Sequence, residues 1–128
     1  MQVKTRQLLS ILFIEDNEDD YILASEIISG SDTKLSWATS LAEGINHLKE
    51  ENFDVVCLDL GMPESSGVKT LELLMEEVDP LPPVIVLTGN DDEEIAQEAI
   101  VKGAQDYLVK GRVTRDLLLR TMRYSIER

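Results

Sequence analysis

Leu9-Ser10-Ile11-Leu12-Phe13-Ile14 runs directly into Glu15-Asp16-Asn17, and this junction decides the fold. The residues before the junction are almost continuously apolar and rich in β-branched, aromatic and leucine side chains. Such a run is typical of a strand that is buried on both faces, as in a parallel sheet. The run stops abruptly at an acidic pair. We therefore predict a buried parallel strand over 9–14 with carboxylates at its carboxyl end.

The same succession of an apolar run and a helical pattern repeats along the rest of the chain. Further strands are predicted at 35–38, 55–58, 84–87 and 107–109. Each strand is followed by apolar side chains at the spacing of an amphipathic helix, within 21–28, 41–48, 68–75, 95–100 and 113–126. This alternation predicts one α/β domain of the doubly wound, flavodoxin-like kind, with a five-stranded parallel sheet covered by helices on both sides.

Local signals predict the ends of two helices. Ser40 precedes the second helix and Glu43 lies three residues later, which is the pattern of a capping box. Asp91 or Asp92 is expected to cap the fourth helix. Gly103 is expected to end that helix, because glycine adopts the left-handed conformation that follows many helices.

The composition is that of a globular domain with a strongly acidic surface. The 128 residues include 12 Lys and Arg against 25 Asp and Glu, a formal net charge of −13. A surface this negative repels nucleic acid phosphates and anionic lipid. The longest apolar stretches, such as 8–14, fall far short of the ~20 residues that cross a bilayer. We therefore expect a cytoplasmic protein without nucleic acid or membrane partners.

Two residues with reactive side chains are interpreted as structural. Cys57, the single cysteine, lies inside an apolar run and has no second thiol for a disulfide or a zinc site, so we predict a small buried hydrophobe. His47 belongs to the second helix, away from the strand ends, and is interpreted as a surface histidine.

Polar side chains follow four of the five predicted strands at the point where each strand ends. The first strand ends at Glu15 and Asp16, the third at Asp59, the fourth at Thr88 and the fifth at Lys110. In open α/β sheets the functional crevice lies beyond the carboxyl ends of the strands, where the strand order reverses. With the strand order 2-1-3-4-5, these side chains converge on one edge of the sheet.

The converging residues predict a divalent cation and a phosphoryl group as ligands. Carboxylates about 4 Å apart repel one another by several kcal/mol at the effective dielectric of a protein surface, so they need a compensating cation. Oxygen ligands alone favour Mg²⁺, which also binds phosphate oxygens. Lys110 supplies a positive charge and Thr88 a hydroxyl donor to such a group. Asp59, at the centre, is the expected nucleophile.

Each of these residues also has a simpler interpretation. The acidic residues over 15–20 complement the dipole of a helix that begins there. An aspartate at the end of a strand is usually a cap or turn residue, and a lysine there is usually solvated. The joint occurrence of the acidic pair, the third carboxylate, the hydroxyl and the lysine, each after a different strand, favours the phosphoryl site.

In combination these residues resemble the receiver domains of two-component response regulators, the CheY-like group. The resemblance rests on Glu15-Asp16, on Asp59-Leu60-Gly61-Met62-Pro63 with Gly67, on Thr88 and on Lys110. It covers essentially the whole of residues 1–128. It implies that Asp59 accepts a phosphoryl group from a sensor histidine kinase or a phosphotransfer protein, and that phosphorylation switches the conformation to control an output.

The resemblance also implies how Mg²⁺ is bound. Asp16 and Asp59 would hold the ion through their carboxylates and Gly61 through its backbone carbonyl. Glu15 would act mainly through water.

A switch is implied in the same way. Thr88 and Lys110 would contact the phosphoryl oxygens. Tyr107 matches the aromatic residue whose ring turns inward when the threonine moves toward the phosphate. Its simpler interpretation is a half-buried aromatic residue of the fifth strand.

The sequence departs from the family pattern after Lys110. Gly111 stands where the family usually has a proline in a cis peptide bond. A cis bond before glycine would cost ~2.5 to 4 kcal/mol, so we expect a trans bond here.

The last helix is basic, whereas the rest of the chain is acidic. Its arginines are Arg112, Arg115, Arg120, Arg123 and Arg128. In the family, the face made by the fourth helix, fifth strand and fifth helix often mediates dimers or output contacts, although arginines also complement a helix C-terminus. Because nothing stops the helix before Arg128, we expect that the chain belongs to a longer protein with a C-terminal output domain.

Two other functions remain open at this point. A Mg²⁺-dependent phosphatase of the haloacid dehalogenase type also uses an aspartyl nucleophile, but it resembles Asp-x-Asp, and Gly61 stands where its general acid would be. A pseudo-receiver would bind partners without phosphorylation. The expected function is a signalling module that catalyses its own phosphorylation and dephosphorylation and turns over no metabolite.

Overall fold

The structure is a computed structural model that describes residues 8–62, 67–89 and 92–127. Within these ranges five strands alternate with five α-helices, and a 3₁₀ turn, η1, lies before the last helix. The elements are β1 (Leu9–Ile14), α1 (Glu18–Ile27), β2 (Thr33–Ala38), α2 (Leu41–Glu50), β3 (Val55–Asp59), α3 (Val68–Glu77), β4 (Val84–Thr88), α4 (Glu93–Lys102), β5 (Asp106–Val109), η1 (Lys110–Arg112) and α5 (Arg115–Glu127).

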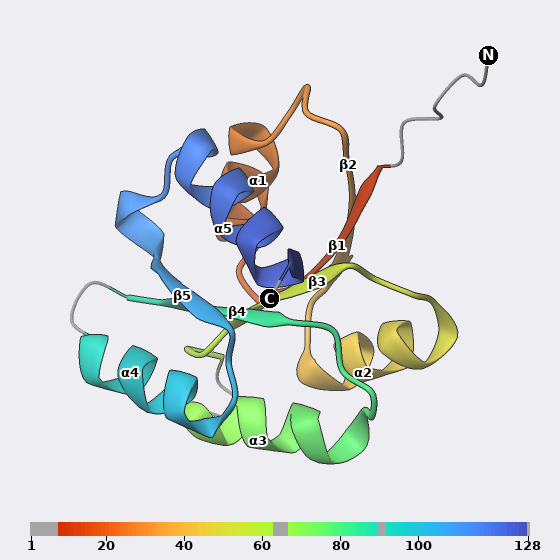
Figure 1. The fold of residues 1–128 in the computed structure, drawn as a ribbon, viewed down its shortest axis with the longest axis vertical. Helices are drawn as coiled ribbons and strands as arrows, with labels where there is room; N and C mark the ends of the chain where they lie inside the picture. The colour runs from red at the N-terminus through yellow and green to blue at the C-terminus, as the bar shows by residue number, and fades with distance from the viewer. Residues whose placement is uncertain (1–7, 63–66, 90–91, 128) are drawn as a thin grey trace.

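The strands form one parallel sheet in the order β2-β1-β3-β4-β5, as the sequence predicts (Figure 1). The order reverses between β1 and β3, where the chain goes first to one side of β1 and then to the other. In the register of the sheet, Asp59 pairs with Leu87 and Thr88 with Val109. The ends of β3, β4 and β5 therefore lie level with one another.

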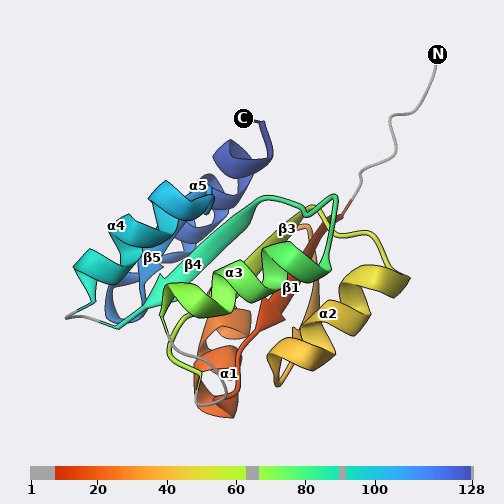
Figure 2. The ribbon, with the colours of Figure 1, turned by 90° about the horizontal axis from the view of Figure 1, so that it is seen from below.

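The sheet is the middle layer of three (Figures 1 and 2). Side chains of α2, α3 and α4 share a core with Leu12 and Ile14 of β1. Side chains of α1 and α5 share the opposite core with Ile11 and Phe13 of the same strand. Because successive residues of a strand face opposite sides, both cores need apolar residues from β1. This explains why its sequence is continuously apolar.

Two predicted helix ends are confirmed, and a third in part. The Ser40 side chain accepts a hydrogen bond from the backbone N–H of Glu43 at 3.1 Å and caps α2. Gly103 ends α4 with a φ of 131°, in the region that favours glycine. Asp92 occupies the position before α4, but its side chain makes no capping hydrogen bond. Asp91 lies outside the described residues.

The apolar faces predicted for two helices are partly wrong. No residue of α1 is buried, and Ile22 is 41% exposed. The residues that pack toward the sheet are Tyr21, Ala24, Ile27 and Ile28, and Ile22 is not among them. In α4 the buried stripe consists of Ala96 and Ala99, whereas Ile100 lies at its edge and is 38% exposed.

Gly44 marks the closest approach of α2 to the sheet. It is buried in the middle of the helix, and a Cβ added there would lie 2.7 Å from Cγ1 of Ile14. Glycine costs a helix interior about 1 kcal/mol relative to alanine. The close approach to β1 explains why this cost is tolerated.

Gly44→Ala is therefore expected to lower the free energy of unfolding by about 1–3 kcal/mol, although alanine favours the helix. Urea denaturation of the variant and the wild type measures the change. In an Ile14→Val background the same substitution should cost less, because valine lacks the terminal methyl group that the new Cβ would meet. A Gly44→Ala protein more stable than the wild type would contradict the tight contact.

Candidate functional site

The carboxyl ends of β1, β3, β4 and β5 meet at one pocket of about 310 Å³. The pocket is lined by Asp16, Asn17, Asp20, Asp59, Leu60, Gly61, Thr88, Gly89, Asp92, Ile95 and Lys110. Glu15 lies next to it, within reach of Asp16 and Asp59. The structure thus brings together the five side chains that the sequence places at the strand ends. Tyr107 lies on β5, half-buried, and does not line this pocket.

Three carboxylates form a cluster between β1 and β3. Oxygen atoms of Glu15, Asp16 and Asp59 all lie within 4.8 Å of one another, with Glu15 and Asp59 buried and Asp16 exposed. The pKa of Glu15 is raised to about 8, first by burial and then by the neighbouring Asp59 carboxylate, whose effect exceeds the opposing effect of Lys110. Without a bound cation, Glu15 therefore keeps a proton at neutral pH.

Lys110 compensates part of this negative charge. Its Nζ atom lies 2.8 Å from Oδ2 of Asp20, 2.9 Å from Oε1 of Glu15 and 3.3 Å from Oδ1 of Asp59. Burial alone would lower the pKa of Lys110, but the hydrogen bonds to Asp20 and Glu15 and the charge of Asp59 outweigh it and raise the pKa. The lysine is therefore a fixed positive charge at this edge of the sheet.

Backbone groups orient the Asp59 carboxylate. The N–H of Gly61 donates to Oδ1 of Asp59 at 2.9 Å. The N–H of Leu60 donates to the carbonyl of Leu87 at 3.1 Å, and the N–H of Gly67 to the carbonyl of Leu60 at 2.8 Å. The turn after β3 is thus tied to β4 and to the start of α3, and it holds the carboxylate next to Lys110.

The hydroxyl of Thr88 has no hydrogen-bond partner among the described residues. Its Oγ1 atom is buried and makes no hydrogen bond within the part of the chain that the structure describes. Buried hydroxyl groups almost always have a partner, because an unsatisfied one costs about 1–3 kcal/mol. Since Thr88 lines the pocket, the missing partner is expected to be a group that enters the pocket.

Sequence reasoning misses Asp20. This residue belongs to the first turn of α1, and the sequence assigns it only to an acidic helix start. The backbone N–H of Asp20 donates to the Asn17 side chain at 2.9 Å, which caps the helix and places its first turn beside Lys110. The position of Asp20 could have indicated its role, because the first turn of α1 lies at the same edge of the sheet as the other site residues.

Sequence reasoning also misses Trp37. Its indole N–H donates to the backbone carbonyl of Glu15 at 2.7 Å. The indole ring stacks on Tyr21, with centroids 4.6 Å apart and planes 3° apart. Because the Glu15 carbonyl follows the last residue of β1, this hydrogen bond extends the pairing of β1 with β2 and fixes the backbone of the acidic pair.

The residues of the site fit a small divalent cation. The clustered donors are carboxylate oxygens, which Mg²⁺ prefers over nitrogen and sulfur ligands. Opposite ligands of Mg²⁺ lie about 4.2 Å apart, close to the 4.8 Å span of the cluster. Two of the three carboxylates are buried beside a single ammonium group, so a cation would relieve the remaining repulsion.

Three further expectations agree with the structure. Cys57 is fully buried, and burial raises the pKa of its thiol to about 12. His47 is half-buried on α2, 3.6 Å from the Glu51 carboxylate and far in the fold from the strand ends. In the described part of the chain the cis peptide bond lies at Asp79–Pro80, so the bond between Lys110 and Gly111 is trans.

The parallel sheet and the acidic pocket at its reversal point define a flavodoxin-like α/β protein. A family description, response regulator receiver domain, matches residues 11–122. The chain therefore belongs to the response regulator receiver domain family, which confirms the resemblance in the sequence. It is a receiver domain of the kind found in two-component signalling.

The sequence is also similar to individual response regulator proteins. The chain is 29% identical over 106 residues to the transcriptional regulatory protein ZraR of Escherichia coli, a match that covers 83% of this chain and 24% of ZraR. It is 29% identical over 101 residues to the chemotaxis protein CheY of Thermotoga maritima, covering 78% of this chain and 83% of that protein. The chain thus spans about a quarter of the length of ZraR and most of the length of this CheY.

A solved structure of a receiver domain also matches the fold of this chain. The crystal structure of a response regulator receiver domain protein from Clostridium thermocellum matches with a TM-score of 0.82 and 30% sequence identity, over 94% of this chain and 95% of that one. Among the described residues no helix is both long and apolar enough to span a bilayer.

The raised pKa of Glu15 predicts how stability depends on pH in the absence of divalent cations. The unfolded chain loses this proton near pH 4.5 and the folded chain near pH 8. Folding therefore takes up a proton between these values, so the stabilisation is complete below pH 4.5 and is lost as the pH rises toward 8. The decrease should be on the order of a few kcal/mol.

Urea denaturation in EDTA at several pH values measures this dependence. Glu15→Gln is the control, because it removes the titrating group and leaves His47 in place. The unfolding free energy of the wild type minus that of the variant should decrease as the pH rises. A wild-type protein that becomes more stable than the variant between pH 5 and 8 would contradict the assignment.

Proposed function

We propose that Asp59 is the phosphoacceptor of this receiver domain and that its phosphorylation controls an output. The observation that carries the proposal is the setting of the Asp59 carboxylate. It lies 3.3 Å from the Lys110 ammonium, inside a cluster of carboxylates, in a pocket shared with the unpartnered hydroxyl of Thr88. This combination offers a nucleophile together with two donors for phosphoryl oxygens.

The reaction is a transfer of one phosphoryl group. An oxygen of Asp59 attacks the phosphorus atom, and the bond between phosphorus and the donor breaks as the donor leaves with the electron pair. With a sensor histidine kinase or a phosphotransfer protein the broken bond is P–N of a phosphohistidine, and with acetyl phosphate it is P–O, which releases acetate. Hydrolysis of the acyl phosphate returns Asp59 and inorganic phosphate.

The charged residues of the pocket have distinct roles in this proposal. Asp16 and Asp59 would hold Mg²⁺ through carboxylate oxygens, Gly61 through its carbonyl, and Glu15 through water. The ion neutralises phosphoryl oxygens when it is bound. Lys110 pairs with one of these oxygens, and its fixed charge supports the transfer by electrostatic stabilisation.

Thr88 and Tyr107 form the proposed switch. Once a phosphoryl oxygen is present, the Thr88 hydroxyl gains the partner that it lacks, and the threonine moves toward it. Tyr107, half-buried two residues before the end of β5 and packed against the core of α3 and α4, then turns inward. Driving such an equilibrium from 1:99 to 99:1 needs about 5.5 kcal/mol, which a few charge-assisted hydrogen bonds can supply.

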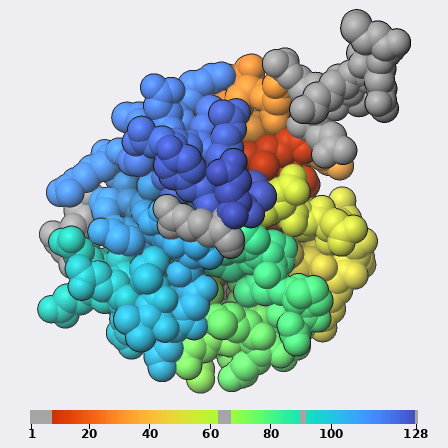
Figure 3. All heavy atoms as spheres, in the orientation of Figure 1, coloured from red at the N-terminus to blue at the C-terminus, as the bar shows by residue number. Residues whose placement is uncertain are grey.

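The proposed output surface is the face of α4, β5 and α5. Figure 3 shows α5 in dark blue and α4 in cyan on the same side of the molecule. The first turn of α4 is acidic, with Glu93 and Glu94, while α5 exposes Arg120 and Arg123. Opposite charges on neighbouring helices suit a symmetric pairing of two copies, in which each acidic helix meets a basic one.

The setting of the domain belongs to the same proposal. We place the domain in the cytoplasm. It serves as a signalling module and not as an enzyme of metabolism. Gly61, two residues after Asp59, cannot supply the general acid of an aspartyl phosphatase, which weighs against that alternative.

Acetyl phosphate with Mg²⁺ tests the proposal directly. Intact mass should rise by one phosphoryl group in the wild type, and hydroxylamine should remove it, because acyl phosphates react with that nucleophile. Asp59→Asn should stay unmodified, and EDTA should prevent modification of the wild type. The matched control is Asp54→Asn, on the loop before β3 at the opposite edge of the sheet.

Three results would contradict the proposal. Modification of Asp59→Asn at the wild-type rate would place the phosphoryl group elsewhere. A wild type that no donor modifies would make the chain a pseudo-receiver, and steady release of phosphate from many sugar phosphates would make it a phosphatase.

A further inference from the structure

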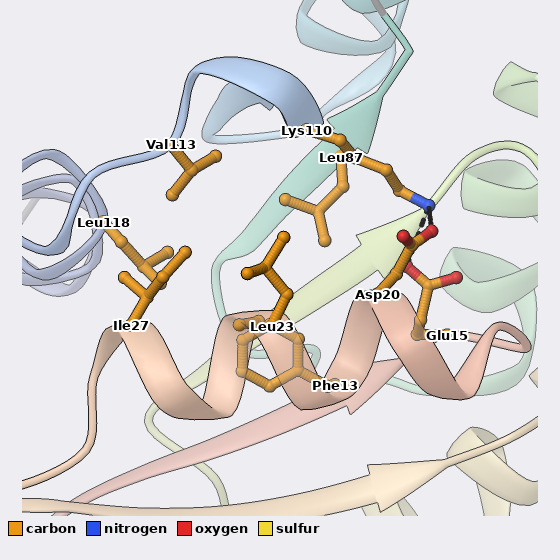
Figure 4. Close-up of a pocket in the computed structure, with 10 residues that line it drawn as sticks. Phe13, Glu15, Asp20, Leu23, Ile27, Leu87, Lys110, Val113 and Leu118 are labelled. Atoms are coloured by element: carbon orange, nitrogen blue, oxygen red, sulfur yellow. Dashed lines mark hydrogen bonds and ion pairs between the residues drawn. The ribbon is translucent and has the colours of Figure 1, made fainter.

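The Lys110 ammonium group has a carboxylate partner outside the cluster that would hold a cation. Its Nζ atom donates to Oδ2 of Asp20 at 2.8 Å, as close as its contact with Glu15 at 2.9 Å and closer than Asp59 at 3.3 Å. Figure 4 shows Lys110 reaching down to Asp20 on α1, with Glu15 beside it. The cation cluster itself consists of Glu15, Asp16 and Asp59.

Asp20 lies between two hollows of the molecule. On one side is the pocket of about 310 Å³ that contains Asp59 and Thr88. On the other is an apolar cavity of about 50 Å³ between α1 and α5, lined among others by Leu23, Leu87 and Val113 (Figure 4). Asp20 and Lys110 line both hollows, so their ion pair is the wall between them.

A phosphoryl group on Asp59 must compete for this ammonium group. A lysine has three hydrogen atoms to donate, and acidic oxygen atoms of Asp20, Glu15 and Asp59 already lie 2.8, 2.9 and 3.3 Å from Nζ. A new contact with a phosphoryl oxygen therefore displaces an existing one. The side chains of Glu15 and Asp59 are 2% and 4% exposed, whereas Asp20 is 40% exposed. Asp20 is thus the partner that water can replace at the lowest cost.

We propose that Asp20 is a positioning residue that holds Lys110 in the unphosphorylated protein and competes with the phosphoryl group for it. This inference rests on the proposed function, because it needs a phosphoryl group on Asp59. Release of Lys110 also frees the first turn of α1, a helix without a buried residue. Asp20 therefore opposes phosphorylation and links the state of Asp59 to the attachment of α1.

The rate constant for phosphorylation by acetyl phosphate, measured by intact mass at saturating Mg²⁺, tests the competition. Asp20→Asn should react about five-fold faster than the wild type, the factor that corresponds to about 1 kcal/mol for a partly exposed ion pair. Asp19→Asn is the matched control. Asp19 is exposed and lies one residue before Asp20 on α1, and the substitution removes the same charge. It should change the rate much less. Asp20→Glu, which restores a carboxylate, should bring the rate back toward the wild-type value.

A second measurement tests the ion pair without any phosphoryl donor. Unfolding free energies in EDTA are compared for the wild type, Asp20→Asn, Lys110→Met and the double variant. The loss in the double variant should be smaller than the sum of the two single losses. Damage to the fold would lower the phosphorylation rate. A faster reaction of Asp20→Asn, together with non-additive losses for Asp20 and Lys110, therefore distinguishes the proposed role of Asp20 from a loss of structure.

Three outcomes would overturn the inference. These are equal rates for Asp20→Asn and Asp19→Asn, a slower reaction of Asp20→Asn, and additive losses in the four-protein comparison. Each of them leaves the proposed function intact as long as the wild type is modified and Asp59→Asn is not. Failure of the proposed function would show instead as an unmodified wild type.

Discussion

The site depends on one ammonium group surrounded by carboxylates. Lys110 lies within 3.3 Å of Glu15, Asp20 and Asp59, which arrive from two strands and a helix that are far apart in the sequence. At such distances like charges repel strongly and opposite charges attract strongly, particularly where burial removes water. The lysine allows the acidic residues to lie close enough to share a cation. Their excess of negative charge makes the site suited to a cation.

The parallel sheet makes this arrangement possible. Its strands all end at the same edge, and the reversal of strand order between β1 and β3 opens a crevice there. The apolar strand interiors, buried on both faces, keep that edge rigid, while short turns carry the polar side chains. Within the described residues, the buried hydroxyl of Thr88 has no hydrogen-bond partner.

The sequence predicts the parallel sheet from strand periodicity, and with the order 2-1-3-4-5 of a flavodoxin-like fold it predicts the meeting of five polar side chains. The sequence does not predict that α1 has no buried residue, because the apolar residues of this helix follow helical spacing whether or not they are buried. The contacts of Asp20 and Trp37 depend on how far α1 and β2 extend toward the site. The unsatisfied state of Thr88 depends on every neighbouring atom. Such features depend on the three-dimensional arrangement of side chains, which the sequence pattern does not specify.

The most direct test of the central claim is the Mg²⁺ affinity of Lys110→Met, obtained from the dependence of its unfolding free energy on Mg²⁺ concentration. If Lys110 stands in for a cation among the carboxylates, its removal should make Mg²⁺ bind more tightly than to the wild type. Lys102→Met, on the exposed surface of α4, should bind Mg²⁺ like the wild type. An affinity of Lys110→Met equal to or weaker than that of the wild type would contradict the account.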